Sequence, residues 1–162
     1  MKQLWAPWRM EYLQSDGSQQ CIFCIGDKTG EDRERLILFR GAFGFVIMNH
    51  YPYSNGHLMV APYRHLADPG GLTADEALEM HSLTVASQTI LRQAFGAEGF
   101  NLGMNIGAPA GAGVVGHIHQ HIVPRWSGDN NFMPVLADVR VIPEHLASTY
   151  QRLSEAFARF SL

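Results

Sequence analysis

The 162-residue chain has few cysteines, no long apolar run and no excess of basic residues. Because Cys21 and Cys24 are its only cysteines, a framework of disulfides like that of small secreted domains is excluded. No run of about 18 apolar residues occurs, so no membrane-spanning helix is predicted. The formal net charge of −3 argues against non-specific binding to nucleic acid, which requires a basic surface. We therefore expect a globular protein whose partners are neither membranes nor nucleic acids.

Internal repeats and low-complexity segments are also missing, and the length suits one domain. The first residues, MKQLWAPWRMEYL, carry Arg9 and Glu11 within their apolar part and lack a small-residue cleavage site. We therefore expect no signal peptide, and we expect a cytoplasmic location. We predict a single domain over residues 1–162, made of an aromatic N-terminal arm, a core and a C-terminal extension: 1–20, 21–126 and 127–162. The arm is expected to pack on the domain or on a second subunit.

Apolar patterns predict an α+β fold, with an antiparallel sheet of about five strands covered on one face. A long central helix is expected between Thr73 and Gly96, because Thr73 and Glu76 form a capping box and Gly96 supplies the stop. A short amphipathic helix is expected after Pro143. The predicted strands are RLILFR, FGFVIMN, GHLMVAP, FNLGMNI and HIHQHIVPR, at residues 35–40, 43–49, 56–62, 100–106 and 117–125.

The last of these strands places three histidines at alternate positions, His117, His119 and His121. Alternate residues of a strand share one face, so neighbouring imidazoles are expected roughly 6–7 Å apart. Three interpretations are open on this evidence. The histidines are a packed polar face, they chelate a metal, or one is a nucleophile whose neighbours stabilise a developing anion.

A glycine-rich loop, NIGAPAGAGVVG, leads directly into the histidine strand. It offers several backbone N–H groups with few side chains in the way, and such a loop can hold phosphate oxygens. An ordinary flexible turn is the alternative. Gly111 and Gly113 are the candidate phosphate-binding positions within it.

The segment HIHQHIV resembles the H-φ-H-φ-H-φ-φ pattern of the histidine-triad superfamily of nucleotidyl hydrolases and transferases. The similarity extends through NHYPYSNGHLMVAPYRHL and NLGMNIG, over about residues 21–126. The flanking segments LWAPWRMEYL, PRWSGDNNFMP and RVIPEHL look like the bacterial branch associated with diadenosine tetraphosphate phosphorylase activity.

This resemblance implies a histidine-triad fold and a role for each matching residue. His119 would attack the α-phosphorus and carry the nucleotide, while His121 and His57 would assist at the phosphate oxygens. Asn105 would hold a phosphate or bridging oxygen, and Asn49 would bind the ribose. The implied substrate is an adenosine polyphosphate with AMP as a product, and family members are usually homodimers.

The resemblance also implies a structural zinc site and no organic cofactor. In some members, a pair like Cys21 and Cys24 is completed by histidines that correspond to His65 and His117. Four protein ligands leave no open position, so such a zinc would not activate water. Two buried thiols are the alternative for CIFC, and a redox pair is disfavoured because no βαβ pattern follows.

The chain departs from the family's nucleotide hydrolases at Val114, where those enzymes often carry serine or threonine. The leaving group would then be protonated by the backbone, by water or by His57. The leading hypothesis is phosphorolysis or hydrolysis of a dinucleoside polyphosphate such as diadenosine tetraphosphate. The alternatives are a nucleoside phosphoramidate hydrolase, a non-catalytic nucleotide-binding module, and a zinc hydrolase that uses all three triad histidines.

Overall fold

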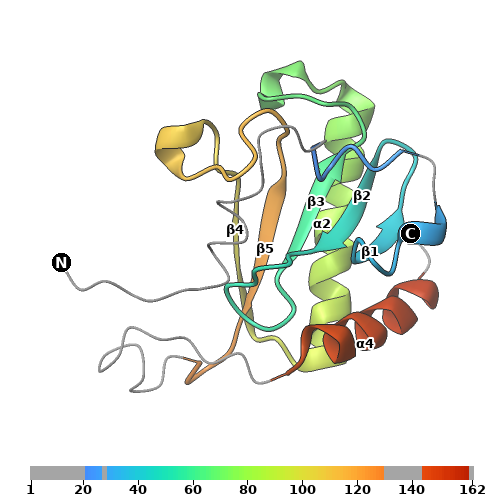
Figure 1. The fold of residues 1–162 in the computed structure, drawn as a ribbon. Coiled ribbons are helices and arrows are strands. Elements are labelled where there is room, and N and C mark those ends of the chain that lie inside the picture. The colour runs from blue at the N-terminus through green and yellow to red at the C-terminus, as the bar shows by residue number, and fades with distance from the viewer. Residues whose placement is uncertain (1–20, 27–28, 130–143, 161–162) are drawn as a thin grey trace.

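The computed structural model describes residues 21–26, 29–129 and 144–160, and its architecture is a five-stranded antiparallel sheet with two long helices (Figure 1). The strand order across the sheet is β1-β2-β3-β5-β4. The bounds are β1 (Ile37–Arg40), β2 (Gly44–Met48), β3 (Leu58–Pro62), β4 (Gly99–Gly103) and β5 (Gln120–Arg125). The predicted α+β class and strand number are confirmed. The predicted aromatic arm lies outside the described residues.

Helix α2 (Ala74–Phe95) begins and ends where the local signals predict. The Thr73 side chain accepts from the Glu76 N–H, and the Glu76 carboxylate accepts from the Thr73 N–H. Gly96 ends the helix in the left-handed conformation, with φ 63°. The guanidinium of Arg64 bonds the same carboxylate, and these hydrogen bonds lower the pKa of Glu76 to about 2. The helix start is therefore anchored both locally and by a distant residue.

Both long helices cover one face of the sheet, with α2 behind the central strands and α4 (Leu146–Ala158) near β1 (Figure 1). Alternate residues of the strands point into this interface, where they meet the inner faces of the two helices. The buried residues of this helix-side core include Val46, Met48, Leu58, Val60, Met80, Leu83, Ile90, Ile122, Leu153 and Phe157. Burial of this apolar area against the sheet holds the scaffold of the site together.

The opposite face of the sheet is covered by the segment around the two cysteines. Phe23 and Ile25 pack there against strand residues that include Ile47 and Met59, and Cys21 lies at the edge of this second cluster. Phe23 is 1% exposed. Expecting cover on only one face was therefore incomplete, because residues 21–25 also cover the part of the second face formed by β1, β2 and β3.

The strand predicted over residues 117–125 begins only at Gln120, so His117 and His119 precede it. The ladder between β3 and β5 ends at the pair Val60 and Gln120, and two residues further along β3 stands Pro62, which has no N–H to donate. The Ile118 N–H bonds the Leu66 carbonyl instead. Tertiary hydrogen bonds thus replace the sheet ladder at the first two triad histidines.

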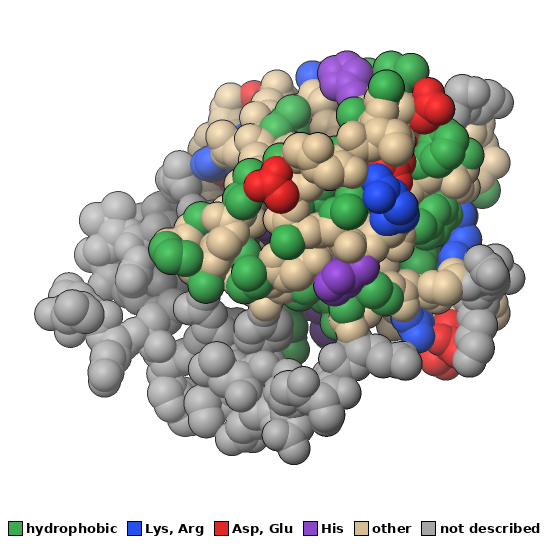
Figure 2. Space-filling view, turned by 90° about the horizontal axis from the view of Figure 1, so that it is seen from above, with side chains coloured by type: hydrophobic (Ala, Val, Ile, Leu, Met, Phe, Trp, Pro, Cys, Tyr) green, Lys and Arg blue, Asp and Glu red, His purple; other side chains and the backbone are tan. Residues whose placement is uncertain are grey.

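The surface carries scattered charges and some apolar side chains. On the face in Figure 2, basic side chains are interspersed with acidic and hydrophobic ones. Three histidines without motif support, His50, His81 and His145, are exposed. Within the described ranges, no helix is both long and apolar enough to cross a bilayer.

Candidate active site and metal centre

The three triad histidines meet on the sheet face that Phe23 covers. The Phe23 ring centroid lies 5.4 Å from that of His117 and 4.5 Å from that of His119. The His119 and His121 rings meet edge to face, with centroids 4.8 Å apart. This is closer than the roughly 6–7 Å expected from the rise between alternate residues of a regular strand, and His119 lies one residue before β5.

The hydrogen bond of His119 defines which of its nitrogens is free. Its Nδ1 lies 2.9 Å from the carbonyl oxygen of His117, which can only accept. Nδ1 therefore carries the proton of the neutral ring, and Nε2 keeps its lone pair. Burial lowers the pKa of His119, which favours this neutral form. The result is an uncharged imidazole with a nucleophilic nitrogen.

A second chain of hydrogen bonds connects His57 and His121. The Tyr53 backbone N–H donates to His57 Nδ1 at 3.1 Å, so the proton of the neutral His57 ring sits on Nε2. That Nε2 lies 3.0 Å from His121 Nδ1 and donates to it. His121 then carries its own proton on Nε2. This Nε2 is buried and has no hydrogen-bond partner among the residues the model describes.

Electrostatics keep this pair neutral. Burial, followed by repulsion from the neighbouring imidazoles, lowers the pKa of His57 to about 3. The same causes lower the pKa of His121 to about 4. Both rings are uncharged near neutral pH, so His121 offers an N–H donor without a fixed positive charge. A buried donor with no partner costs free energy unless a ligand accepts from it.

The two asparagines implied by the resemblance lie on different elements. Asn49 follows β2, its Oδ1 accepts from the Tyr51 N–H, and its Nδ2 lies 3.3 Å from His57 Nδ1. Asn105 is half-buried and follows β4 by two residues. The β4–β5 register pairs Gly103 with His121, so the chain continues from this pair toward Asn105 on one strand and His119 on the other.

The glycine-rich loop contains a short 3-10 helix, η3 (Ala108–Ala110), that the sequence did not predict. Gly111 follows it at φ 84°, and its N–H donates to the Ala108 carbonyl. Gly113 is exposed. The next three residues, Val114 to Gly116, have backbone N–H groups with no acceptor in the described part of the chain. These groups lie closest in sequence to the triad and are available to an anionic ligand.

Four side chains gather at the other end of the triad and form a candidate metal centre. The ligand atoms of Cys21, Cys24, His65 and His117 all lie within 4.8 Å of one another. His117 Nδ1 is 3.5 Å from Cys21 Sγ and 3.8 Å from Cys24 Sγ, and His65 Nδ1 is 3.3 Å from Cys24 Sγ. The model thus brings together two histidines and two cysteines that are separated by up to 96 positions.

These distances suit a tetrahedral ion. Zinc with bonds of about 2.0–2.3 Å places its sulfur and nitrogen ligands about 3.5 Å apart. His117 Nε2 lies 2.8 Å from the Pro62 carbonyl and donates to it, which leaves Nδ1 unprotonated for a metal. Burial and the neighbouring Cys21 thiol raise the pKa of the Cys24 thiol, as expected for paired thiols without a cation. The donor set therefore fits zinc.

Sequence reasoning missed three residues that shape these sites. Phe23 stacks on His119, the Tyr53 backbone determines the His57 tautomer, and Gly116 makes room for His65. A Cβ at Gly116 would lie 2.8 Å from His65 Nε2. The position of Phe23 between two candidate ligands was a usable signal. By contrast, no sequence pattern indicates that the Tyr53 N–H donates to His57 or that His65 approaches Gly116 closely.

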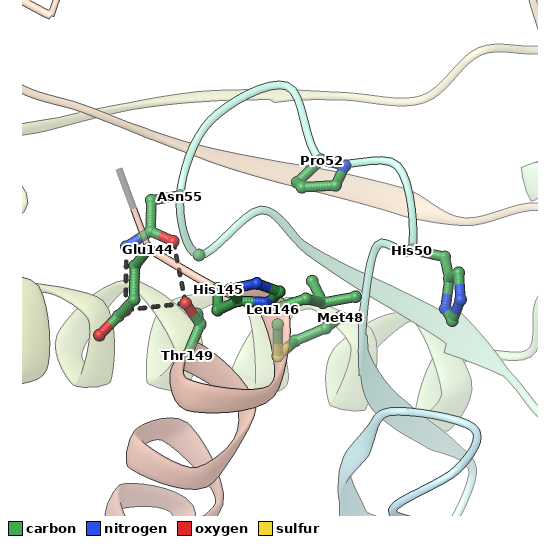
Figure 3. Close-up of a pocket in the computed structure, with 9 residues that line it drawn as sticks. Met48, His50, Pro52, Asn55, Glu144, His145, Leu146 and Thr149 are labelled. Atoms are coloured by element: carbon green, nitrogen blue, oxygen red, sulfur yellow. Dashed lines mark hydrogen bonds between the residues drawn. The ribbon is translucent and has the colours of Figure 1, made fainter. Parts of the chain in front are cut away.

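A cavity of about 400 Å³ lies away from the triad, between the β2–β3 loop and the start of α4 (Figure 3). In Figure 3, Pro52 lies on one side of the cavity and Met48 with Leu146 on the other. Among the residues that line the cavity, Met48 belongs to the helix-side core. The other lining residues are His50, Asn55, Gly56, Glu144, His145 and Thr149. No triad histidine lines it.

The chain is similar to known proteins in both sequence and fold. The model of the HIT domain family matches residues 32–128. Over 98% of its length, the chain is 35% identical to the AP-4-A phosphorylase of Mycobacterium tuberculosis, of which it covers 86%. It is 28% identical to the asymmetrical bis(5'-nucleosyl)-tetraphosphatase of Schizosaccharomyces pombe, with 75% of the chain and 67% of that protein aligned. A Zn-bound histidine triad family protein from Mycobacterium smegmatis has the same fold, with a TM-score of 0.66, 24% identity, and coverage of 88% of this chain and 96% of that one.

Proposed function

The chain belongs to the HIT domain family and is an enzyme of that family, and we propose that it transfers the adenylyl group of a dinucleoside polyphosphate through a covalent nucleotidyl-histidine. The observation that carries this proposal is the pattern of hydrogen bonds at the triad. It leaves a lone pair on His119 Nε2 and an unused N–H on His121 Nε2. A nucleophile beside a preorganised donor is what attack on phosphorus requires.

In the first step, His119 Nε2 forms a bond to the α-phosphorus of one adenosine end. The bond from this phosphorus to its bridging oxygen breaks, and diadenosine tetraphosphate releases ATP. The imidazole gains positive charge as the new bond forms, and the His117 carbonyl that accepts from Nδ1–H stabilises this charge.

His121 and His57 assist at the phosphate oxygens. His121 Nε2–H donates to a non-bridging oxygen, and His57 holds His121 in the tautomer that makes this possible. We assign ribose binding to Asn49 and contact with a phosphate or bridging oxygen to Asn105. We assign phosphate binding to the loop around Gly111 and Gly113, with backbone N–H donors from Val114 to Gly116, because the Gly111 N–H is bonded to the Ala108 carbonyl.

In the second step, an acceptor attacks the adenylylated His119 and the nitrogen–phosphorus bond breaks. Orthophosphate as acceptor yields ADP, and water yields AMP. We favour orthophosphate, because the relative that aligns with 98% of this chain is named a phosphorylase. The acceptor is chosen by contacts around the loop and not by the triad itself.

Product analysis on diadenosine tetraphosphate, with and without orthophosphate, tests this function directly. We expect ATP and ADP by anion-exchange chromatography, with a rate that depends on phosphate. ATP and AMP at a rate independent of phosphate would make the protein a hydrolase and contradict phosphorolysis. No turnover would contradict the dinucleoside polyphosphate substrate, and nucleoside phosphoramidates would be assayed next.

We also propose that Cys21, Cys24, His65 and His117 hold one structural zinc ion. The support is the tetrahedral spacing of the four ligand atoms and the free Nδ1 of His117. When bound by four protein ligands, zinc links the segments that carry them and has no open position for water. His117 would then serve the metal while its neighbour His119 serves the chemistry.

We propose that the enzyme is a homodimer and that it is located in the cytoplasm. Leu78 and Val85 are 66% and 47% exposed, lie seven residues apart on the outer face of α2, and so form one stripe. Leu102, on the outer strand β4, is 48% exposed. We expect analytical ultracentrifugation to give twice the mass of one chain, and a Leu78→Lys, Val85→Lys double variant to shift it toward one. A wild-type chain that sediments as a monomer would refute the homodimer.

A further inference from the structure

Phe23 connects the candidate metal centre to the candidate nucleophile. It stands between Cys21 and Cys24 and is 1% exposed. Its ring stacks on the His119 imidazole, with centroids 4.5 Å apart and planes inclined by 27°. It also contacts His117, with ring centroids 5.4 Å apart. The Phe23 ring therefore contacts both the candidate nucleophile, His119, and a candidate metal ligand, His117. The thiols of the same candidate metal centre belong to Cys21 and Cys24, on either side of Phe23 in the sequence.

The His119 ring is held by two anchors of different kinds. The hydrogen bond from Nδ1 to the His117 carbonyl fixes one edge of the ring but permits rotation about that bond. Stacking on Phe23 restricts the plane of the ring, and both together determine where Nε2 points. His121 approaches from the side, edge to face, so it does not replace the stack.

Both anchors lie on segments that carry candidate metal ligands. His117 is itself such a ligand, and Phe23 lies in the Cys21–Cys24 turn, where the Cys24 N–H bonds the Cys21 carbonyl. An ion that draws these four ligands together also fixes the separation between Phe23 and the His117 backbone. The space left for the His119 ring is thereby defined.

From this geometry we propose that Phe23 is the positioning residue of the nucleophile, through which the Cys21/Cys24/His65/His117 metal centre sets the orientation of His119. This proposal deepens the proposed function and rests on it for the role of His119. Phe23 touches neither phosphorus nor the departing oxygen in this scheme. It acts by holding Nε2 on the line of attack, and such alignment contributes strongly to rate.

Kinetics of a Phe23→Leu variant provide the first test. Leucine keeps an apolar side chain but removes the stacking surface. We expect kcat for diadenosine tetraphosphate to fall by about 10–100-fold, the cost of a misplaced reacting group, while KM and the zinc content stay near wild type. Phe45→Leu is the matched control, because Phe45 is fully buried in the same cluster and its ring stacks on that of Tyr63. The control should lose similar thermal stability and keep kcat.

A readout independent of turnover comes from the ring protons of His119. In wild-type protein loaded with zinc, stacking on Phe23 should shift the His119 carbon-bound proton resonances upfield, and a His119→Gln variant identifies these resonances. We expect the upfield shift to be lost in Phe23→Leu and on removal of zinc with a chelator, but to persist in Phe45→Leu.

An upfield shift that survives zinc removal would overturn the link to the metal centre. An unchanged kcat in Phe23→Leu would overturn the positioning role. Failure of the proposed function would look different, because wild-type protein would then turn over no dinucleoside polyphosphate while the ring-proton shifts still responded to Phe23 and zinc.

Discussion

Replacing His119 with alanine is expected to abolish turnover of diadenosine tetraphosphate and to leave AMP binding intact. The variant lacks the Nε2 lone pair that is assigned to attack on phosphorus, so no nucleotidyl-histidine can form. Loss of a nucleophile that acts as part of a unit lowers kcat by a factor on the order of 10⁴ or more. Steady-state kinetics and calorimetric titration with AMP measure the two quantities separately.

A matched control is His81→Ala, which removes an exposed histidine from α2. It should keep wild-type kcat, AMP affinity and melting temperature. In wild-type protein, rapid quenching with radiolabelled substrate should trap a labelled chain that the His119→Ala variant does not form. A His119→Ala enzyme with near wild-type kcat would refute the assignment of the nucleophile.

Loss of one candidate metal ligand is expected to have the second-largest effect, on stability. A Cys21→Ala variant should bind no zinc and melt earlier, while it keeps partial activity. An ion present at about 1,000 times its Kd stabilises the folded state by about 4 kcal/mol. For a domain of this size that corresponds to a lower melting temperature by roughly 8–16 °C. Elemental analysis and calorimetry check the two parts of this expectation.

Chelation supplies the control for this variant. Exhaustive treatment of wild-type protein with a chelator should lower its melting temperature to that of Cys21→Ala, and the variant itself should not respond. Residual activity after chelation would exclude a catalytic metal, in agreement with four protein ligands at a closed site. Wild-type protein purified without chelators and found to contain no zinc would contradict the metal centre.

Features that depend on neighbouring residues were predicted well. The capping box of Thr73 and Glu76 and the stop at Gly96 formed as expected, because each rests on hydrogen bonds within a few residues. The inward positions of α2, such as Leu83 and Ile90, are buried because helical periodicity places them on one face. The five strands followed from short apolar segments bounded by turns or loops.

Prediction was less successful where distant segments compete for the same backbone. The histidine strand starts three residues later than its pattern indicates, because Pro62 cannot extend the ladder and Leu66 captures the Ile118 N–H. The separation of the His119 and His121 rings was also overestimated, because the backbone rise does not define where the side chains point. No local pattern carries information about which carbonyl of another segment will accept a given N–H.

The sequence by itself determined the residue types, their alternation and the local signals that define the helices and strands, and so it was sufficient to indicate three histidines and two cysteines as candidates. Only the tertiary structure decided which hydrogen-bond partner each imidazole has. It placed the Pro62 carbonyl on His117, the His117 carbonyl on His119, and His57 on His121, across separations of up to 64 positions. Each contact assigns a proton to one ring nitrogen, and therefore decides whether a chemically identical imidazole has a free lone pair or an N–H to donate.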